Sequence, residues 1–250
     1  MTSNVLTINR LKGWAQSNKL GALYLWFRHG VKKRKLKQIF HFVSKGHLIC
    51  NYRIKKYLHT ESLKRLQIGG GYHTKQGWIN GDLIAGDIYL DAARRFPFPD
   101  ESIDLVFAEQ FIEHLSFEQG SYCLRECCRV LKKGGKIRLS TPDLENLCSL
   151  YKNNNPDVDL KTVMARHKAQ HNRGLTTPCH LMNDFFRLWG HSFIYDEQTL
   201  RMQLGQAGFS SILRRKFGQS DEKSLQGLER HADVEWMKNA FQLIVEANKE

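Results

Sequence analysis

At residues 66–71 the sequence reads LQIGGG, a short apolar segment that leads directly into three glycines. Glycine tolerates positive φ and has no Cβ, so such a turn lets backbone N–H groups approach a ligand closely. Farther along, the run Ile103–Ala108 is apolar enough for a strand that is buried on both faces. Together the two segments predict a parallel sheet, while the glycines after its first strand could either approach a ligand or form a plain tight turn.

Short apolar runs and helical stretches alternate from residue 66 onward, which predicts an α/β fold with a mostly parallel sheet. A helix over Phe117–Leu131 is expected to end at Lys132–Gly135, because basic residues and glycines are typical of helix C-termini. Further strands are predicted at Trp78–Asp82, Asp87–Asp91, Lys136–Ser140, Ser211–Phe217 and Phe241–Glu246, and further helices at about 158–169 and at Glu197–Ala207.

Charge divides the 250-residue chain into two parts. The whole sequence has 38 basic and 25 acidic side chains, but its first 65 residues hold 15 basic and one acidic, a balance of +14. We therefore expect a basic helical arm over 1–62 and one principal domain over 63–250. Residues 150–195 are less regular than the rest of that domain, and we expect them to form a lid.

Within the arm, apolar residues recur at three- and four-residue intervals, which predicts an amphipathic helix over about 20–45. Its basic cluster, Lys32–Lys35, could bind an anionic membrane, grip RNA phosphates or stay solvated while the helix packs on the protein, and the sequence leaves these alternatives open. Because a membrane-spanning run, a secretion signal and a disulfide pattern are all missing, the expected location is the cytoplasm, with the inner face of the membrane as a second option.

Two aspartates follow the glycine turn where further strands are predicted to end. Asp82 could accept hydrogen bonds from both hydroxyls of a ribose, and Asp91 could accept one from the amino group of a purine. Either aspartate alone is more typical of a turn residue that bonds its own backbone. In this order, at the carboxyl ends of parallel strands, the glycines and aspartates indicate a nucleoside pocket.

The same region resembles a known family. The segments that carry the resemblance are LQIGGG (66–71), GWINGD (77–82), Asp91, FPFPDESID (96–104), EHL (113–115), LRECCRVLKKGG (124–135), TPDL (141–144), YD (195–196) and AGF (207–209). They are similar to class I S-adenosylmethionine-dependent methyltransferases of type 11, in particular to short bacterial forms with a Gly-Trp-x-Asn-x-Asp segment. The similarity covers about residues 63–250.

The resemblance implies a Rossmann-like sheet of seven strands, mostly parallel, whose last strand near Phe241–Glu246 is antiparallel. It also implies S-adenosylmethionine as cofactor, with Asp82 on the ribose and Asp91 on the adenine, while Glu109 and Gln110 border the sulfonium and the substrate. The residues implied to bind the cofactor are Gly69, Gly70, Gly71, Asp82, Leu83, Asp91, Ala92, Glu109 and Gln110.

Methyl transfer from a sulfonium is an in-line displacement, so alignment and desolvation can supply much of the acceleration. A hydroxyl acceptor still benefits from a base. His114, His180 and His191, with Glu109 behind them, are the candidates, although a structural role is open for each histidine. No constellation of metal ligands is visible in the sequence, so we expect activity without added metal.

Resemblance to enzymes of cell-surface saccharide synthesis suggests O-methylation of a saccharide or a lipid-linked glycan, by family analogy alone. RNA methylation is the second hypothesis. It is motivated by the basic arm, although the domain lacks the Asn-Pro-Pro-Tyr and Asp-Pro-Pro-Tyr signatures. The third hypothesis is an inactive binding or scaffold protein, because Gln67 stands where many relatives carry an acidic residue. The sequence does not predict an oligomeric state.

Overall fold

The computed structural model describes residues 47–152, 160–171, 177–230 and 241–250. The amphipathic helix predicted over 20–45, with its possible membrane or RNA contacts, lies outside the described residues. The helices are α4 (His47–Thr60), η1 (Ile112–His114), α5 (Phe117–Val130), α6 (Leu144–Tyr151), α7 (Leu160–His171), α8 (Pro178–Arg187), α9 (Glu197–Gln206) and η2 (Lys223–Leu225). The strands are β1 (Arg65–Ile68), β2 (Ile79–Asp82), β3 (Ile88–Tyr89), β4 (Ile103–Glu109), β5 (Leu131–Pro142), β6 (Phe209–Arg214) and β7 (Gln242–Lys249).

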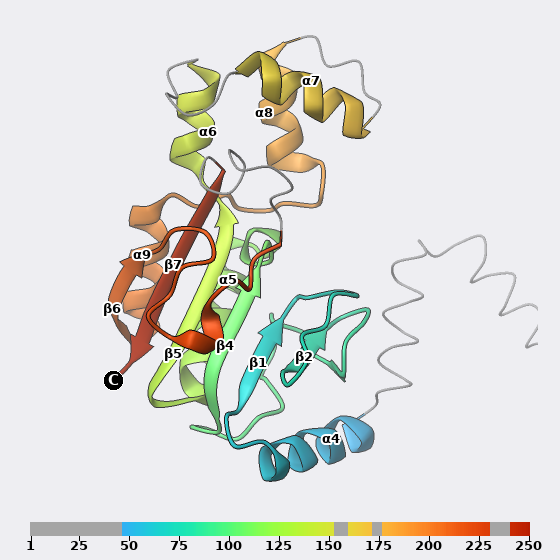
Figure 1. Ribbon diagram of the computed structural model, residues 1–250, viewed down its shortest axis with the longest axis vertical. Helices are drawn as coiled ribbons and strands as arrows, with labels where there is room; N and C mark the ends of the chain where they lie inside the picture. The colour runs from blue at the N-terminus through green and yellow to red at the C-terminus, as the bar shows by residue number, and fades with distance from the viewer. Residues whose placement is uncertain (1–46, 153–159, 172–176, 231–240) are drawn as a thin grey trace, which may run out of the picture.

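One sheet of seven strands runs through the molecule in the order β3-β2-β1-β4-β5-β7-β6 (Figure 1). Strands β1 to β5 pair in parallel, and β7 is antiparallel to both β5 and β6. The predicted Rossmann-like sheet with an antiparallel last strand is therefore confirmed. Its strand order reverses between β1 and β4, so the carboxyl ends of these two strands border the crevice where α/β folds bind ligands.

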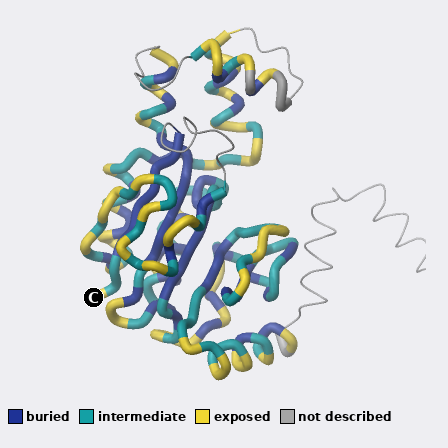
Figure 2. Tube along the Cα trace, in the orientation of Figure 1, coloured by how far each residue is buried: buried dark blue, intermediate teal, exposed yellow. Residues whose placement is uncertain are grey.

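The two faces of the sheet are covered differently. Val106 of β4 belongs to the main core, which also contains apolar residues of α5 and α9. The alternate residues Leu105 and Phe107 pack on the other side with Trp78 and with Leu225 of η2. The β1–β2 connection is a loop without a helix, and the segment between β6 and β7 supplies cover on this side. Figure 2 shows the central strands as largely buried.

This covering segment, residues 215–230, is called the strap below. A buried cation ties it to the sheet: Arg138 of β5 is fully buried, and its Nε donates to Glu229 of the strap at 2.5 Å. The same guanidinium donates to Glu246 of β7 at 2.6 Å and to the carbonyl of Gln219 at 2.8 Å. Strap, β5 and β7 therefore share one buried ion-pair network.

Helices α6, α7 and α8 lie together beyond the carboxyl end of β5 (Figure 1). Their apolar residues form a second, smaller core that includes Leu147, Val163 and Leu181. This helical layer falls within the region predicted to be a lid, and its function as a lid stays a prediction. None of the described helices is long and apolar enough to cross a membrane.

Several predicted boundaries differ from the observed ones, and two of these differences lie where strand pairing is irregular. The helix from Phe117 ends at Val130, and Lys132–Gly135 belong to β5, whose register with β4 shifts between Ile103 and Leu105. The next-to-last strand starts at Phe209 rather than Ser211, because its pairing with β7 shifts between Ser210 and Leu213. Such bulges insert residues that sequence periodicity does not reveal.

We expect Arg138→Leu to lower the free energy of unfolding by about 3–5 kcal/mol, because Glu229 would stay buried without its cation and Glu246 would keep only Arg215, 3.0 Å away. The matched control is Arg95→Leu. Arg95 lies 3.6 Å from Asp100, and both side chains are largely exposed, so its loss should change stability little. Urea unfolding measures both variants. Equally small changes would show that the Arg138 network does not hold the strap.

Candidate active site

The glycine turn begins where β1 ends, and each glycine meets a different constraint. Gly69 has φ +70°, and a Cβ there would lie 2.0 Å from Cδ2 of Phe111. At Gly70 a Cβ would lie 2.4 Å from Nε2 of Gln67. Gly71 has φ +57°, yet a Cβ would meet nothing within 4 Å, so this glycine borders open space. The turn is therefore tightly packed at its start and open at its end.

Gln67 explains the packed side of the turn. Its side chain is buried, and its Nε2 donates to the carbonyl oxygen of His73 at 3.2 Å. A carboxylate cannot donate this bond, which gives a structural reason for an amide at this position. Its other polar atom, Oε1, is buried and accepts no hydrogen bond within the described part of the chain.

Asp82, at the end of β2, is joined directly to the turn. Its Oδ2 accepts from the N–H of Gly71 at 3.0 Å, and its Oδ1 accepts from the N–H of Ile84 at 2.8 Å. The backbone N–H of Gly69 also donates to the carbonyl of Gly81 at 2.9 Å. The structure thus brings the predicted glycines and Asp82 together, with half-buried Leu83 next to them.

Asp91 follows β3 on the same edge of the sheet. Its Oδ1 accepts from the N–H of Ala93 at 3.0 Å, and its Oδ2 lies 3.2 Å from the exposed Arg94. This is the local turn contact that the sequence suggested for an isolated aspartate. Ala92 is buried beside it. Contact of Asp91 and Ala92 with adenine stays a prediction.

The loop after Asp91 is clamped by α5. Arg129 donates to the carbonyls of Phe96 at 3.1 Å and Phe98 at 2.9 Å, while Glu126 accepts from the N–H of Phe96 at 2.7 Å. The same Arg129 pairs with Glu126 at 2.7 Å. These contacts explain physically why the segments 96–104 and 124–135 occur together in the sequence pattern.

Glu109 and Gln110 lie at the carboxyl end of β4. Gln110 has φ +48°, an unfavourable conformation for a side chain with a Cβ, and its N–H donates to the carbonyl of Ser140 at 2.7 Å. The carboxylate of Glu109 is buried and accepts from the N–H of Arg230 at 2.6 Å. The strap therefore reaches the site, and a catalytic role for Glu109 stays a prediction.

Sequence reasoning missed Arg230 and Lys75. Lys75 donates to the carbonyl of Leu228 in the strap at 2.7 Å and lies over the ring of Phe107. Burial lowers the pKa of Lys75, while the nearby Glu109 acts in the opposite direction. No local signal could have revealed these contacts, because the strap is far from both β1 and β4 in the sequence.

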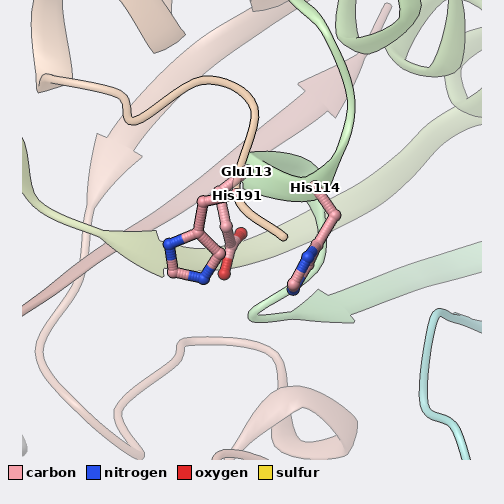
Figure 3. Close-up of side chains that lie close together, drawn as sticks. All are labelled: Glu113, His114 and His191. Carbon is pink, nitrogen blue, oxygen red and sulfur yellow. The ribbon is translucent and has the colours of Figure 1, made fainter. Parts of the chain in front are cut away.

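Two of the predicted histidines come together next to Glu113 (Figure 3). The rings of His114 and His191 have centroids 5.0 Å apart, and Glu113 is fully buried beside them. Burial raises the pKa of Glu113 to about 8, although Thr141 donates to its Oε2 at 3.0 Å. Burial also lowers the pKa of His191. His180, in contrast, is exposed at the start of α8.

An aromatic group continues this site toward α8. The ring of Trp189 lies 5.5 Å from that of His191 and 5.8 Å from that of Phe185, which stacks on Phe241. Trp189 is 38% exposed, a large exposed fraction for a tryptophan with so many ring contacts. The site thus has a polar pair of imidazoles beside an accessible indole.

Comparison with known proteins identifies the domain. Residues 75–139 match the methyltransferase domain family, and this stretch runs from the end of the glycine turn through β2, β3, β4 and α5 into β5. The match indicates a methyltransferase domain over about a quarter of the chain. The sheet with its antiparallel β7 is the fold that the sequence resemblance implied. S-adenosylmethionine is the cofactor expected from that resemblance.

Several solved structures match this chain at low sequence identity. An S-adenosylmethionine-dependent methyltransferase from Archaeoglobus fulgidus is 18% identical, with 84% of this chain and 98% of that chain covered and a TM-score of 0.48. One from Mesorhizobium loti is 17% identical (76% and 92% covered, TM-score 0.44). Phosphoethanolamine N-methyltransferase 2 from Haemonchus contortus is 12% identical (90% and 59% covered, TM-score 0.45). No curated protein matches the sequence.

The residues around the turn fit the cofactor. Gly71 borders open space beside the carboxylate of Asp82, where ribose hydroxyls could donate. The buried Oε1 of Gln67 is an acceptor for which the described residues supply no donor, which suits the ammonium group of the methionine part of the cofactor. Both features therefore point to the predicted pocket.

We expect Gly69→Ala to lower the melting temperature and to abolish cofactor binding, because its Cβ would overlap the ring of Phe111. The matched control is Gly134→Ala, which has a similar φ of +74° but meets nothing within 4 Å. Its cost should be that of the backbone conformation alone, about 1 kcal/mol. Thermal unfolding and calorimetric titration compare the two variants. Equal melting shifts would show that Phe111 does not constrain the turn.

Proposed function

We propose that this methyltransferase transfers a methyl group from S-adenosylmethionine to a hydroxyl of a saccharide or a lipid-linked glycan. The observation that supports this acceptor class is the exposed indole of Trp189 beside the half-buried His191. An aromatic face packs well against the apolar face of a sugar ring, while neighbouring polar groups bind its hydroxyls.

The two halves of the proposed site are joined through η1. The ring of Phe111 packs on Gly69, and η1 begins at Ile112, directly after Phe111, and ends at His114. Only two residues separate Phe111 from His114, so an acceptor held near His114 and His191 would lie close to the glycine turn. Direct transfer requires the acceptor oxygen to reach the methyl carbon with no side chain between them.

In the proposed reaction the cofactor supplies a methyl group bound to a positively charged sulfur. A lone pair of the acceptor oxygen forms the new bond to the methyl carbon, the carbon–sulfur electron pair goes to sulfur, and the hydroxyl proton leaves to solvent. The aromatic group around Trp189 would exclude water from the acceptor, and the bond from Arg230 to Glu109 would fix the end of β4.

We expect Asp82→Asn to weaken binding of S-adenosylmethionine by at least about tenfold, because the amide keeps one acceptor and loses the charge that strengthens bonds from hydroxyls. Asp104→Asn is the matched control. Asp104 is also half-buried and accepts a backbone N–H, from Lys64 at 2.7 Å, but it lies near the start of β4. Calorimetric titration with S-adenosylmethionine measures the affinity of both variants. Equal affinities in both variants would refute the pocket at Asp82.

Replacement of Trp189 by alanine should raise KM for a saccharide acceptor and leave cofactor affinity unchanged, because the indole would contact the acceptor and not the cofactor. Phe186→Ala is the control, since Phe186 is exposed to a similar extent, 41%, on α8. The assay transfers a labelled methyl group to a panel of saccharides and lipid-linked glycans. A folded enzyme that methylates RNA and no saccharide would reject the proposal.

The two other hypotheses receive different support. RNA methylation depends on the basic cluster Lys32–Lys35, which lies outside the described residues, so it stays a prediction. The scaffold hypothesis was motivated by Gln67. The hydrogen bond from its side-chain amide to the carbonyl of His73 explains the glutamine without any loss of activity.

A further inference from the structure

Three potential metal ligands converge from two distant segments. Glu113 and His114 come from η1, and His191 comes from the segment after α8. One ligand atom of each residue lies within 4.8 Å of the others. Figure 3 shows the carboxylate and both imidazoles around the same small space. The set contains two nitrogens and one oxygen, which is the ligand chemistry of several catalytic zinc sites.

Backbone hydrogen bonds hold the two segments together independently of these side chains. The N–H groups of Ser192 and Phe193 both donate to the carbonyl of Glu113, at 2.7 and 3.1 Å. The hydroxyl of Ser192 donates to the carbonyl of His114 at 3.3 Å. Backbone hydrogen bonds therefore hold the three side chains close together, as a preorganised binding site requires.

The carboxylate of Glu113 is suited to a cation. Its side chain has no exposed surface, Oε2 accepts from Thr141, and Oε1 has no hydrogen-bond partner among the described residues. A buried carboxylate oxygen without a partner is costly, and a bound cation removes that cost. Thr141 meanwhile fixes the orientation of the carboxylate, as hydrogen-bonded neighbours of metal ligands commonly do.

His191 has the tautomer that a metal ligand needs. Its Nδ1 lies 2.5 Å from the carbonyl oxygen of Phe185. Because a carbonyl oxygen only accepts, Nδ1 carries the proton in this contact, and Nε2 keeps its lone pair. A ligand histidine typically donates its other ring N–H to a carbonyl in this way.

We propose that Glu113, His114 and His191 bind a first-row divalent transition metal, with Zn²⁺ as the best fit to this ligand set. Ligand atoms around tetrahedral zinc lie roughly 3.4 Å apart, so small side-chain rotations of the two half-buried histidines complete the site. Three protein ligands leave a further position open. The sequence predicted no metal because its ligands belong to segments that only the fold brings together.

This site also bears on the methyl acceptor, a consequence that rests on the proposed function. An acceptor hydroxyl at the open position would lose its proton to solvent more easily, because a cation stabilises the resulting negative oxygen. The same oxygen would then form the bond to the methyl carbon, and the electron pair of the broken carbon–sulfur bond would remain on sulfur. Metal binding itself does not depend on this step.

The test uses the full-length protein after chelation and dialysis. Calorimetry with Zn²⁺ and visible absorption with Co²⁺ should show a site of one equivalent, with the strong Co²⁺ bands of a tetrahedral environment. His114→Gln and His191→Gln should each weaken this site by at least about tenfold. His180→Gln is the matched control and should leave it unchanged, because His180 is exposed at the start of α8. Circular dichroism checks folding.

Unchanged binding in both cluster variants, or no binding by folded wild-type protein, would overturn the metal site and leave the two histidines as candidate bases. Titration of the same samples with S-adenosylhomocysteine measures the cofactor pocket separately. Loss of metal binding with intact cofactor binding would therefore refute only the metal site. Metal binding without cofactor binding would refute only the pocket.

Discussion

The buried guanidinium of Arg138 is the contact on which one whole side of the molecule depends. It joins β5 to β7 through Glu246 and to the strap through Glu229, in a place where no charge is exposed. A single arginine can donate to both carboxylates because its planar group carries N–H bonds in several directions, and Arg215 supplies a second cation to Glu246 at 3.0 Å. With the strap fixed, Leu225 covers Phe107 and Arg230 reaches Glu109.

The strap covers a part of the sheet that the short β1–β2 connection leaves uncovered. That connection turns at three glycines and then returns to β2 without a helix, so part of the sheet needs cover from elsewhere. Lys75, in the connection itself, donates to the strap at Leu228. The contacts that cover the sheet therefore also shape the site. They couple the ends of β1 and β4 to the C-terminal part of the chain.

The site has two chemically different sides that meet at Phe111. On one side the glycine turn, Gln67 and Asp82 form a pocket of backbone N–H groups and acceptors. On the other side lie buried Glu113, the two imidazoles and the aromatic ring of Trp189. The first side borders the stretch that matches a methyltransferase domain. The second depends on how the helical layer of α6 to α8 returns to η1, and it is where acceptor choice and metal binding would be decided.

The sequence by itself determined the α/β class, the order of most strands and helices, and the positions of the glycine turn and the strand-end aspartates. These features depend on local periodicity and on glycine conformation, which neighbouring residues fix. Only the tertiary structure decided the bulges in β5 and β6, the Arg138 network, the contact of Arg230 with Glu109, and the meeting of His191 with Glu113 and His114. Each of these joins segments far apart in the chain, and no local pattern encodes such a contact because its energy exists only when the sheet and its neighbours are assembled.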